Sequence, residues 1–177
     1  MITKIISYVY YLFFSLLMKC IYFNSFHFNV FKCFIRGDVL ISRGGAINAL
    51  GVLTCRFINF NVVGGNLTLG DGVFFNRGCS INCRSKIFIG NNVMFGENVL
   101  VYDHDHKIDN GKPLRNEFIL KDITIENDCW IGSNVVINKG VKIGRNSVVA
   151  SGCVITKDVP PNTTIIQRRN NEYRNNR

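Results

Sequence analysis

Apolar residues recur every six positions through the C-terminal part of the chain. From residue 125 onwards an aliphatic residue begins each six-residue unit, at Ile125, Ile131, Ile137, Ile143, Val149 and Ile155. The residue four places later is small or β-branched in every unit: Cys129, Val135, Val141, Ser147, Cys153 and Val159. An amphipathic helix repeats about every 3.6 residues and a strand about every 2, so neither explains this period. A period of six is typical of a β-helix, in which each unit forms a short strand and a corner.

Three such units close one triangular coil, and this predicts which residues stack. Ile131 should lie beside Val149, three units further on, with both side chains inside the coil. Glycine and asparagine tolerate the positive φ of a tight corner. We expect them to form the corners at Gly132, Asn134, Gly144 and Asn146.

The same frame extends upstream but is interrupted twice. It includes Phe57, Val63, Leu69, Phe75 and Ile81, and after a shift of two it resumes at Ile89, Phe95 and Val101. It then stops until Ile123, and the intervening segment, 102–122, is mostly polar. A long loop of this kind in a compact domain is usually functional, so we expect loop 102–122 to protrude from the β-helix and carry the site.

Residues 1–36 lie outside the repeats and form an apolar, aromatic segment that we expect to be helical. The residues between Lys4 and Lys19 are mostly apolar, but they are too few for a membrane-spanning helix, which needs about 20. The segment therefore either lies on a membrane surface or packs on the domain or a neighbouring subunit. We assign residues 1–36 to this segment, 37–166 to the β-helix and 167–177 to a basic polar tail.

The net charge indicates the kind of partner, and the cysteine content indicates the compartment. The net charge of +9 favours an anionic partner, but the chain contains no nucleic-acid-binding motif, so we expect no nucleic acid. The seven cysteines are odd in number and form no CxxC pair. This argues against a disulfide framework or structural zinc, and it favours buried thiols in a reducing cytoplasm.

The segment CWIGSNVVINKGVKIGRNSVVASGCVITKDVPPN resembles the hexapeptide-repeat acyltransferases. Within that superfamily the chain is most similar to the galactoside and maltose O-acetyltransferases and to the O-acetyltransferases of bacterial surface polysaccharide. The resemblance runs from Gly70 to Pro161, about half the chain. It implies an all-β fold, a left-handed parallel β-helix, and a homotrimer that transfers acetyl groups from acetyl-CoA to a hydroxyl of a sugar or polysaccharide intermediate. It also implies a cytoplasmic enzyme, which we place at the inner face of the bacterial plasma membrane.

The resemblance also suggests which histidine is the general base. In the similar enzymes a loop histidine lies at a characteristic interval before a tryptophan and at another after an asparagine. The first interval is the one between His106 and Trp130, and the second is the one between Asn76 and His106, whereas His104 lies two positions too early for both. We therefore expect His106 to be the base, with His104 as the second choice. Asn76, Trp130, Asp103 and Asp105 are the expected acceptor-binding residues. Asp103 or Asp105 could instead orient the imidazole and fix its tautomer, or be solvated.

The donor site is carried over in the same way. The resemblance places Ser133, Ser151, Thr156 and Lys157 along the pantetheine arm of acetyl-CoA, and Lys157, Arg168 or Arg169 at its phosphates, where cations are needed.

Three alternatives stay open at this point. A nucleotide-sugar N-acetyltransferase would use the same fold on an amine, and a non-catalytic β-helix would serve binding or assembly. A metal enzyme would need three histidines, and His27 is the only third candidate beside His104 and His106. The WIGS segment and the long loop favour acyl transfer, so we expect no metal.

Overall fold

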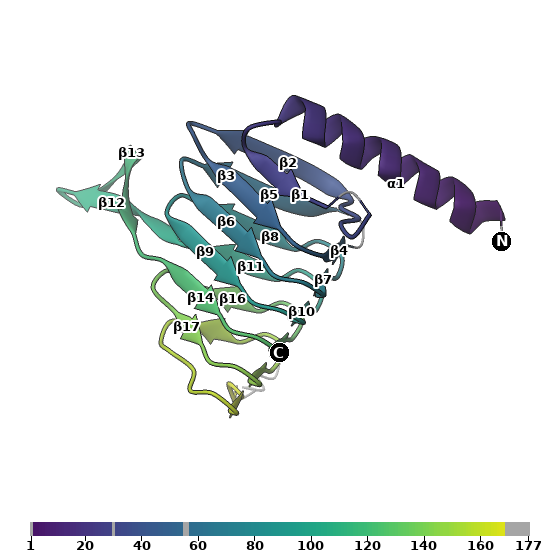
Figure 1. The fold of residues 1–177 in the computed structure, drawn as a ribbon. Helices are drawn as coiled ribbons and strands as arrows, with labels where there is room; N and C mark the ends of the chain where they lie inside the picture. Colours follow the sequence, from purple (N-terminus) through teal and green to yellow (C-terminus); the bar gives the residue numbers. More distant parts are fainter. Residues whose placement is uncertain (1, 30, 55–56, 169–177) are drawn as a thin grey trace, which may run out of the picture.

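The computed structural model describes residues 2–29, 31–54 and 57–168. One helix of this part, α1 (Ile2–Ile21), precedes three stacks of short parallel strands that form the sides of a triangular prism (Figure 1). Successive strands of these stacks pass from one side of the prism to the next, so the fold is a parallel β-helix, as the repeat predicted. Among the described residues, no helix is both long enough and apolar enough to cross a bilayer.

Each side of the prism is a six-stranded parallel sheet, which we call sheets A, B and C. Sheet A consists of β1 (Phe26–Phe28), β3 (Ala46–Ala49), β6 (Asn66–Leu69), β9 (Lys86–Ile89), β14 (Ile123–Ile125) and β17 (Lys142–Ile143). Sheet B consists of β4 (Val52–Thr54), β7 (Val73–Phe75), β10 (Met94–Phe95), β15 (Trp130–Ile131), β18 (Val148–Val149) and β20 (Thr164–Ile165). Sheet C consists of β2 (Gly37–Ser42), β5 (Ile58–Val63), β8 (Ser80–Cys83), β11 (Leu100–Tyr102), β16 (Val136–Ile137) and β19 (Val154–Ile155).

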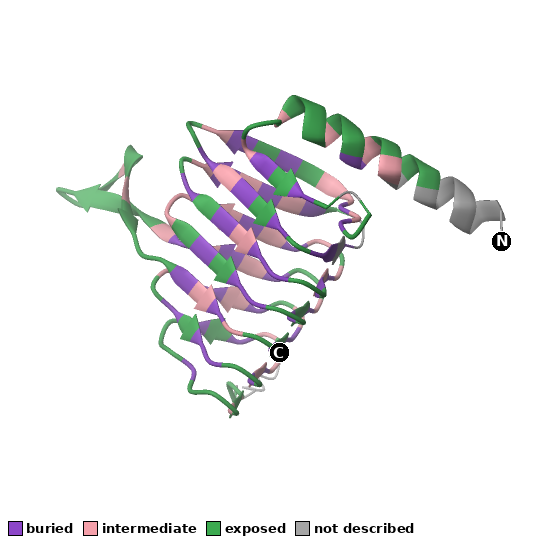
Figure 2. Ribbon diagram, in the orientation of Figure 1, coloured by how far each residue is buried: buried purple, intermediate pink, exposed green. Residues whose placement is uncertain are grey.

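The predicted stacking is confirmed in the C-terminal coils. Ile131 pairs with Val149 in the register of β15 and β18, and both side chains are buried. Inward residues alternate with outward ones along every sheet, which gives the prism one continuous apolar interior (Figure 2). Larger rings fill the upstream interior, where Phe75 stacks on Phe95 with ring centroids 4.5 Å apart.

The upstream coils are longer than six-residue counting predicts. Leu69 pairs with Ile89, whereas three six-residue units would have paired it with Ile87. The strands of sheet A do not cause this, because β14 also buries two residues, Ile123 and Ile125, in a coil of 18 residues. The extra length lies in sheet C, where β8 buries Cys83 in addition to Ile81. This explains the shift of two in the frame after Ile81. The frame was wrong at Phe57, which is 73% exposed and has a φ of 64°, so it forms a corner and not part of the core.

The corners use glycine and asparagine for two different reasons. Asn134 and Asn146 have φ values of 57° and 56°, as predicted for tight corners. Gly132 has no positive φ; instead, a Cβ there would lie 2.6 Å from the backbone nitrogen of Ser151 in the next coil. Gly132 is therefore required for the close approach of neighbouring coils, and not for the conformation of its own corner as the sequence had suggested.

The N-terminal segment joins the prism through β1. This strand pairs with β3, so sheet A begins at Phe26, before the range 37–166 predicted for the β-helix. Two aromatic side chains of β1, Phe26 and Phe28, are buried and cover the first coil of the core. The helix α1 runs across this end of the prism (Figure 1).

Candidate functional site

The polar segment 102–122 is a β-hairpin and not an irregular loop. Its strands are β12 (His104–Asp109) and β13 (Lys112–Leu120), which pair antiparallel and project from the prism (Figure 1). The turn between them is Asn110–Gly111, with both φ values positive, as a two-residue hairpin turn requires. This Asn-Gly pair was the local signal in the sequence that could have identified the hairpin. The hairpin leaves after sheet C and returns to sheet A, so it stands at the corner between these two sheets.

One corner of the preceding coil holds both ends of the hairpin. The carboxylate of Asp103 accepts the backbone N–H groups of Arg84 and Ser85, at 2.9 and 2.7 Å. At the other end, the Ser85 hydroxyl donates to Asp122 at 2.5 Å. These bonds fix the position from which β12 starts, and therefore the positions of its histidines.

Asp103 is fully buried and holds His104. The Nδ1 atom of His104 lies 2.9 Å from an oxygen of Asp103. Burial alone would raise the pKa of Asp103, but hydrogen bonds from His104 and from the N–H groups of Ser85 and Arg84 outweigh it and hold the pKa below its usual value. An ionised Asp103 requires a proton on Nδ1 of His104. The burial of Asp103 is incompatible with the direct acceptor contact that was expected of it from the sequence.

His106 lies two residues further along β12, on the same face. Its Nδ1 is 2.9 Å from the carbonyl oxygen of Leu114. A carbonyl only accepts, so Nδ1 carries a proton, and the neutral form of the ring has its lone pair on Nε2. The His106 side chain is exposed, whereas that of His104 is only 15% exposed.

Phe118 and Arg84 complete this face of the hairpin. The Phe118 ring lies 4.7 Å from the His106 ring and 5.4 Å from the His104 ring, measured between centroids. The Arg84 guanidinium lies 3.9 Å from the centroid of the same ring. Neither residue was predicted from the sequence, because their proximity to the histidines depends on the register of β12 with β13 and on the preceding coil.

Asp105 lies on the opposite face of β12 from the two histidines. Its carboxylate forms an ion pair with Lys139, which belongs to the corner between β16 and β17. The two aspartates beside the histidines therefore have different environments. Asp103 fixes the His104 ring from inside, and Asp105 ties the outer side of the hairpin to the next coil.

The other predicted site residues fall at two corners of the prism. Asn76 follows β7, and Ser133 and Ser151 follow β15 and β18, so these three lie at the corner between sheets B and C. Thr156 and Lys157 follow β19 and are exposed at the corner between sheets C and A, where the hairpin also stands. One chain thus places the predicted donor residues along both edges of sheet C.

Trp130 and the basic tail lie apart from the hairpin. Trp130 begins β15 in sheet B, and its side chain is 54% exposed. Arg168 is exposed just after β20, and Arg169 lies outside the described residues. The side chain of Asn76 accepts the N–H of Arg77 at 2.8 Å, so part of its hydrogen-bonding capacity is used within its own corner.

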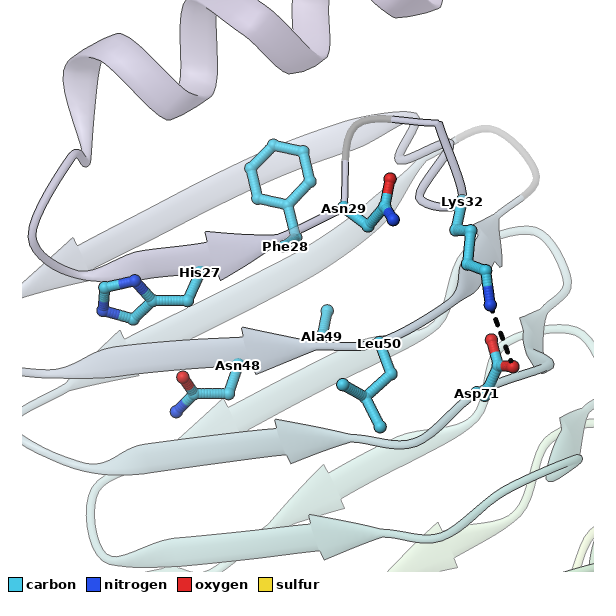
Figure 3. A pocket seen from close by; sticks show the side chains of 8 residues that line it. All are labelled: His27, Phe28, Asn29, Lys32, Asn48, Ala49, Leu50 and Asp71. Atoms are coloured by element: carbon cyan, nitrogen blue, oxygen red, sulfur yellow. Dashed lines mark hydrogen bonds and ion pairs between the residues drawn. The ribbon is translucent and has the colours of Figure 1, made fainter.

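The histidine considered as a third metal ligand is not in the hairpin. His27 lies on β1 and lines a recess of about 480 Å³ at the N-terminal end, together with Asn29, Asn48, Lys32 and Asp71 (Figure 3). Among residues 2–29, 31–54 and 57–168, no three His, Cys, Asp or Glu side chains gather as metal ligands would.

Most of the cysteine thiols in the described residues are buried and therefore poorly placed to react. Five of the described cysteines are buried, and Cys20 is exposed on α1; Cys55 lies outside the described residues. Burial raises the pKa of Cys33 and of Cys129, which keeps both thiols protonated at neutral pH.

The chain is similar in sequence to known hexapeptide-repeat transferases. Residues 122–157 match the family described as bacterial transferase hexapeptide (six repeats). A galactoside O-acetyltransferase from Lactococcus lactis is 36% identical over 102 residues, which cover 58% of this chain and 49% of that protein. A galactoside O-acetyltransferase from Escherichia coli is 39% identical over 99 residues, covering 56% and 49%. The chain therefore spans about half the length of these curated relatives.

A solved structure is similar to this chain in both fold and sequence. It is a hexapeptide-repeat-containing acetyltransferase from Vibrio cholerae in complex with acetyl coenzyme A, 33% identical, with a TM-score of 0.51 over 73% of this chain and 63% of that one. The residues that match the hexapeptide family, 122–157, form the coils in which each six-residue unit pairs with the third unit after it, as Ile131 does with Val149. In its repeat, its fold and its relatives, this chain is similar to the hexapeptide-repeat acetyltransferases.

Proposed function

We propose that the protein is an O-acetyltransferase that uses acetyl-CoA as donor and a sugar hydroxyl as acceptor, with His106 as general base. The observation that carries the proposal is the exposed His106 ring, whose Nδ1 is held by the Leu114 carbonyl. The galactoside O-acetyltransferase relatives and the acetyl coenzyme A bound by the Vibrio cholerae protein support the choice of acceptor and donor.

A sugar hydroxyl is a poor nucleophile, so it needs a base as it attacks. Nε2 of His106 takes the hydroxyl proton while the oxygen bonds to the thioester carbonyl carbon. The resulting imidazolium then returns a proton to the departing thiolate, and the acetyl ester remains on the sugar. A well-placed base of this kind contributes about 10²–10⁴-fold to the rate. No covalent intermediate with the protein is required.

The roles of His104 and Asp103 follow from their burial. His104 is mostly buried, and its ring is bound to a carboxylate that is itself bound to the preceding coil. We assign these two residues to positioning the hairpin, and we assign proton transfer to His106. Asn76 and Trp130 remain the proposed acceptor contacts. Asp105, which is paired with Lys139, is proposed to lie at the edge of the acceptor site.

The donor site requires more than one copy of the chain in this proposal. Ser133 and Ser151 line one edge of sheet C, whereas Thr156, Lys157 and the hairpin occupy the other. Two prisms packed side by side bring one copy's serine corner to its neighbour's hairpin, and a closed ring of three repeats this contact. We therefore propose a homotrimer, with Lys157, Arg168 and Arg169 supplying cations for the phosphates of acetyl-CoA. For the acceptor we propose an intermediate of bacterial surface polysaccharide, modified at the cytoplasmic face of the plasma membrane.

The test is turnover of acetyl-CoA followed by mass spectrometry, with galactoside, maltose and polysaccharide acceptors. Wild-type protein should release CoA and form an acetylated acceptor that mild alkali hydrolyses, as it does esters and not amides. His106→Ala should lose about 10²–10⁴-fold in rate and still bind acetyl-CoA, and Lys107→Ala on the same strand serves as the matched control. Full activity in His106→Ala, or an alkali-stable product, would contradict the assignment.

A further inference from the structure

The helix α1 uses one of its faces to pack on the first coil of the prism. Ser15, Met18 and Tyr22 lie on this face, at helical spacing. Ser15 is 3% exposed, and the Tyr22 hydroxyl donates to the Val39 carbonyl at 3.0 Å. The orientation of the C-terminal half of the helix is therefore fixed by contacts within the chain.

The opposite face of the same helix is apolar and exposed. We call it the outer face of α1, and its members are Val9, Tyr10, Phe13, Leu16, Leu17 and Ile21, exposed by 44% to 67%. Successive residues of an α-helix are about 100° apart, so these six side chains fall within one broad stripe. Figure 2 shows that most of the described residues of the helix are exposed. A contiguous apolar stripe in water indicates an interaction surface.

The charge around this stripe selects the partner. Residues 1–37 contain four cationic side chains, Lys4, Lys19, Lys32 and Arg36, and no aspartate or glutamate, since the first acidic residue is Asp38. Lys32 is partly offset by an ion pair with Asp71 at 3.4 Å, across the recess of Figure 3. The remaining positive charge repels a second copy of this segment, which would bring the same cations together. It attracts a surface of anionic lipid headgroups instead.

We propose that the outer face of α1 is a docking surface for an anionic lipid bilayer, with the helix lying in the plane of the interface. Tyr10 and Phe13 are aromatic side chains of the kind that settle at the boundary between headgroups and acyl chains. The packed face of α1 then carries the prism on the aqueous side. The proposal rests on the packing and charge of α1 and not on the acetyl-transfer reaction.

The first experiment is flotation of the full chain with phosphatidylcholine vesicles that contain or lack phosphatidylglycerol. Wild-type protein should float with the anionic vesicles, and rising salt should release part of it because ionic attraction is screened. The double substitution Phe13→Gln/Leu17→Gln should weaken flotation at least about tenfold, since it removes two apolar side chains from the stripe.

A matched control separates this surface from general apolar exposure. Phe57→Asn/Phe88→Gln removes two side chains that are 73% and 45% exposed on the prism, close to the 67% and 44% of Phe13 and Leu17. The control should float like wild type. Thermal melts should show both variants folded, because all four side chains are exposed. Absence of flotation for the wild type, or equal flotation of both variants, overturns the proposal.

A second measurement tests whether the stripe itself enters the interface. Cys20 lies on the exposed side of α1, and an environment-sensitive dye attached there in a Cys55→Ser background reports its surroundings. Its emission should shift to the blue with anionic vesicles and not with phosphatidylcholine alone. If Phe13→Gln/Leu17→Gln instead changes the sedimentation coefficient while the wild type ignores vesicles, the outer face joins copies of the chain and the lipid proposal is wrong.

Discussion

Replacing Asp103 by Asn separates the two histidines of β12, because the substitution acts on only one of them. The asparagine has nearly the same shape, and its single oxygen takes the place of the oxygen that accepts the N–H groups of Arg84 and Ser85. Its NH₂ group then faces Nδ1 of His104 and donates to it. His104 is forced into the other tautomer, with the proton on Nε2, whereas the bond between His106 and Leu114 is untouched.

The loss of stability in Asp103→Asn can be worked out from the hydrogen bonds that the Asp103 carboxylate accepts, because each of them would no longer be to a charged group. A hydrogen bond to an ionised group contributes about 1.5–3 kcal/mol and a neutral one about 0.5–1.5 kcal/mol. Asp103 accepts two backbone N–H groups and the His104 ring, so losing the charge weakens about three bonds, and relief of the buried charge returns part of this. We expect Asp103→Asn to reduce the free energy of unfolding by about 1–3 kcal/mol, which lowers Tm by about 2–12 °C for a chain of this size.

The assay combines that melting curve with acetyl-CoA turnover. If His106 is the base, Asp103→Asn should keep kcat within about tenfold of wild type, since only the positioning of the hairpin changes. A drop of about 10⁴-fold, the cost of a wrong tautomer in a catalytic imidazole, would refute the assignment and make His104 with Asp103 the catalytic pair. Asp105→Asn is the matched control on the other face of β12. It breaks only a partly exposed ion pair with Lys139, worth about 0–1 kcal/mol.

Three further predictions concern the prism and its response to pH. Phe75→Ala removes a ring stacked on Phe95 inside the coils and should cost about 3–5 kcal/mol in urea unfolding; a cost below about 1 kcal/mol would mean that the interior is not packed as described. Gly132→Ala places a methyl group 2.6 Å from the Ser151 nitrogen and should destabilise by about 1–3 kcal/mol in a thermal melt, so an unchanged melt would contradict the close approach of these coils. The pKa of Asp103 is lower in the folded chain than in the unfolded one, so its contribution is complete above about pH 4 and is lost as the pH falls further, towards its folded pKa. Between about pH 5 and pH 3, wild-type protein should therefore lose more stability than Asp103→Asn, and parallel pH profiles would contradict this account.

The repeat was predictable from the sequence where all three sides of a coil have the same length. In the C-terminal coils three six-residue units make one turn, so the period of six led directly to the stacking of Ile131 on Val149. Upstream, β8 of sheet C buries one more residue, Cys83, and the coil lengthens so that Leu69 stacks on Ile89. A fixed period then assigned Phe57 to the core, although Ile58 is the buried neighbour.

The hairpin shows what pattern alone could not supply. Its polar composition indicated a loop, because an exposed two-stranded hairpin has no buried face to give it an apolar alternation. The Asn110–Gly111 turn was the available local signal. Register is a further step: the turn pairs Ile108 with Pro113, and an irregularity between His106 and Ile108 then shifts the pairing, so that His106 lies opposite Phe118.

The two Asp-His pairs of the motif Asp-His-Asp-His, residues 103–106, have different environments once the motif is placed on a strand. Alternation puts both imidazoles on one face and sends Asp105 to the other, where Lys139 meets it. Asp103, at the base of the hairpin, is directed into the prism and becomes buried, so the first histidine is bound to a carboxylate and the second to a carbonyl. The sequence interval to Trp130 had already favoured the second. Our proposal of His106 as the base rests on the same difference, because the first imidazole is mostly buried against the prism while the second is exposed.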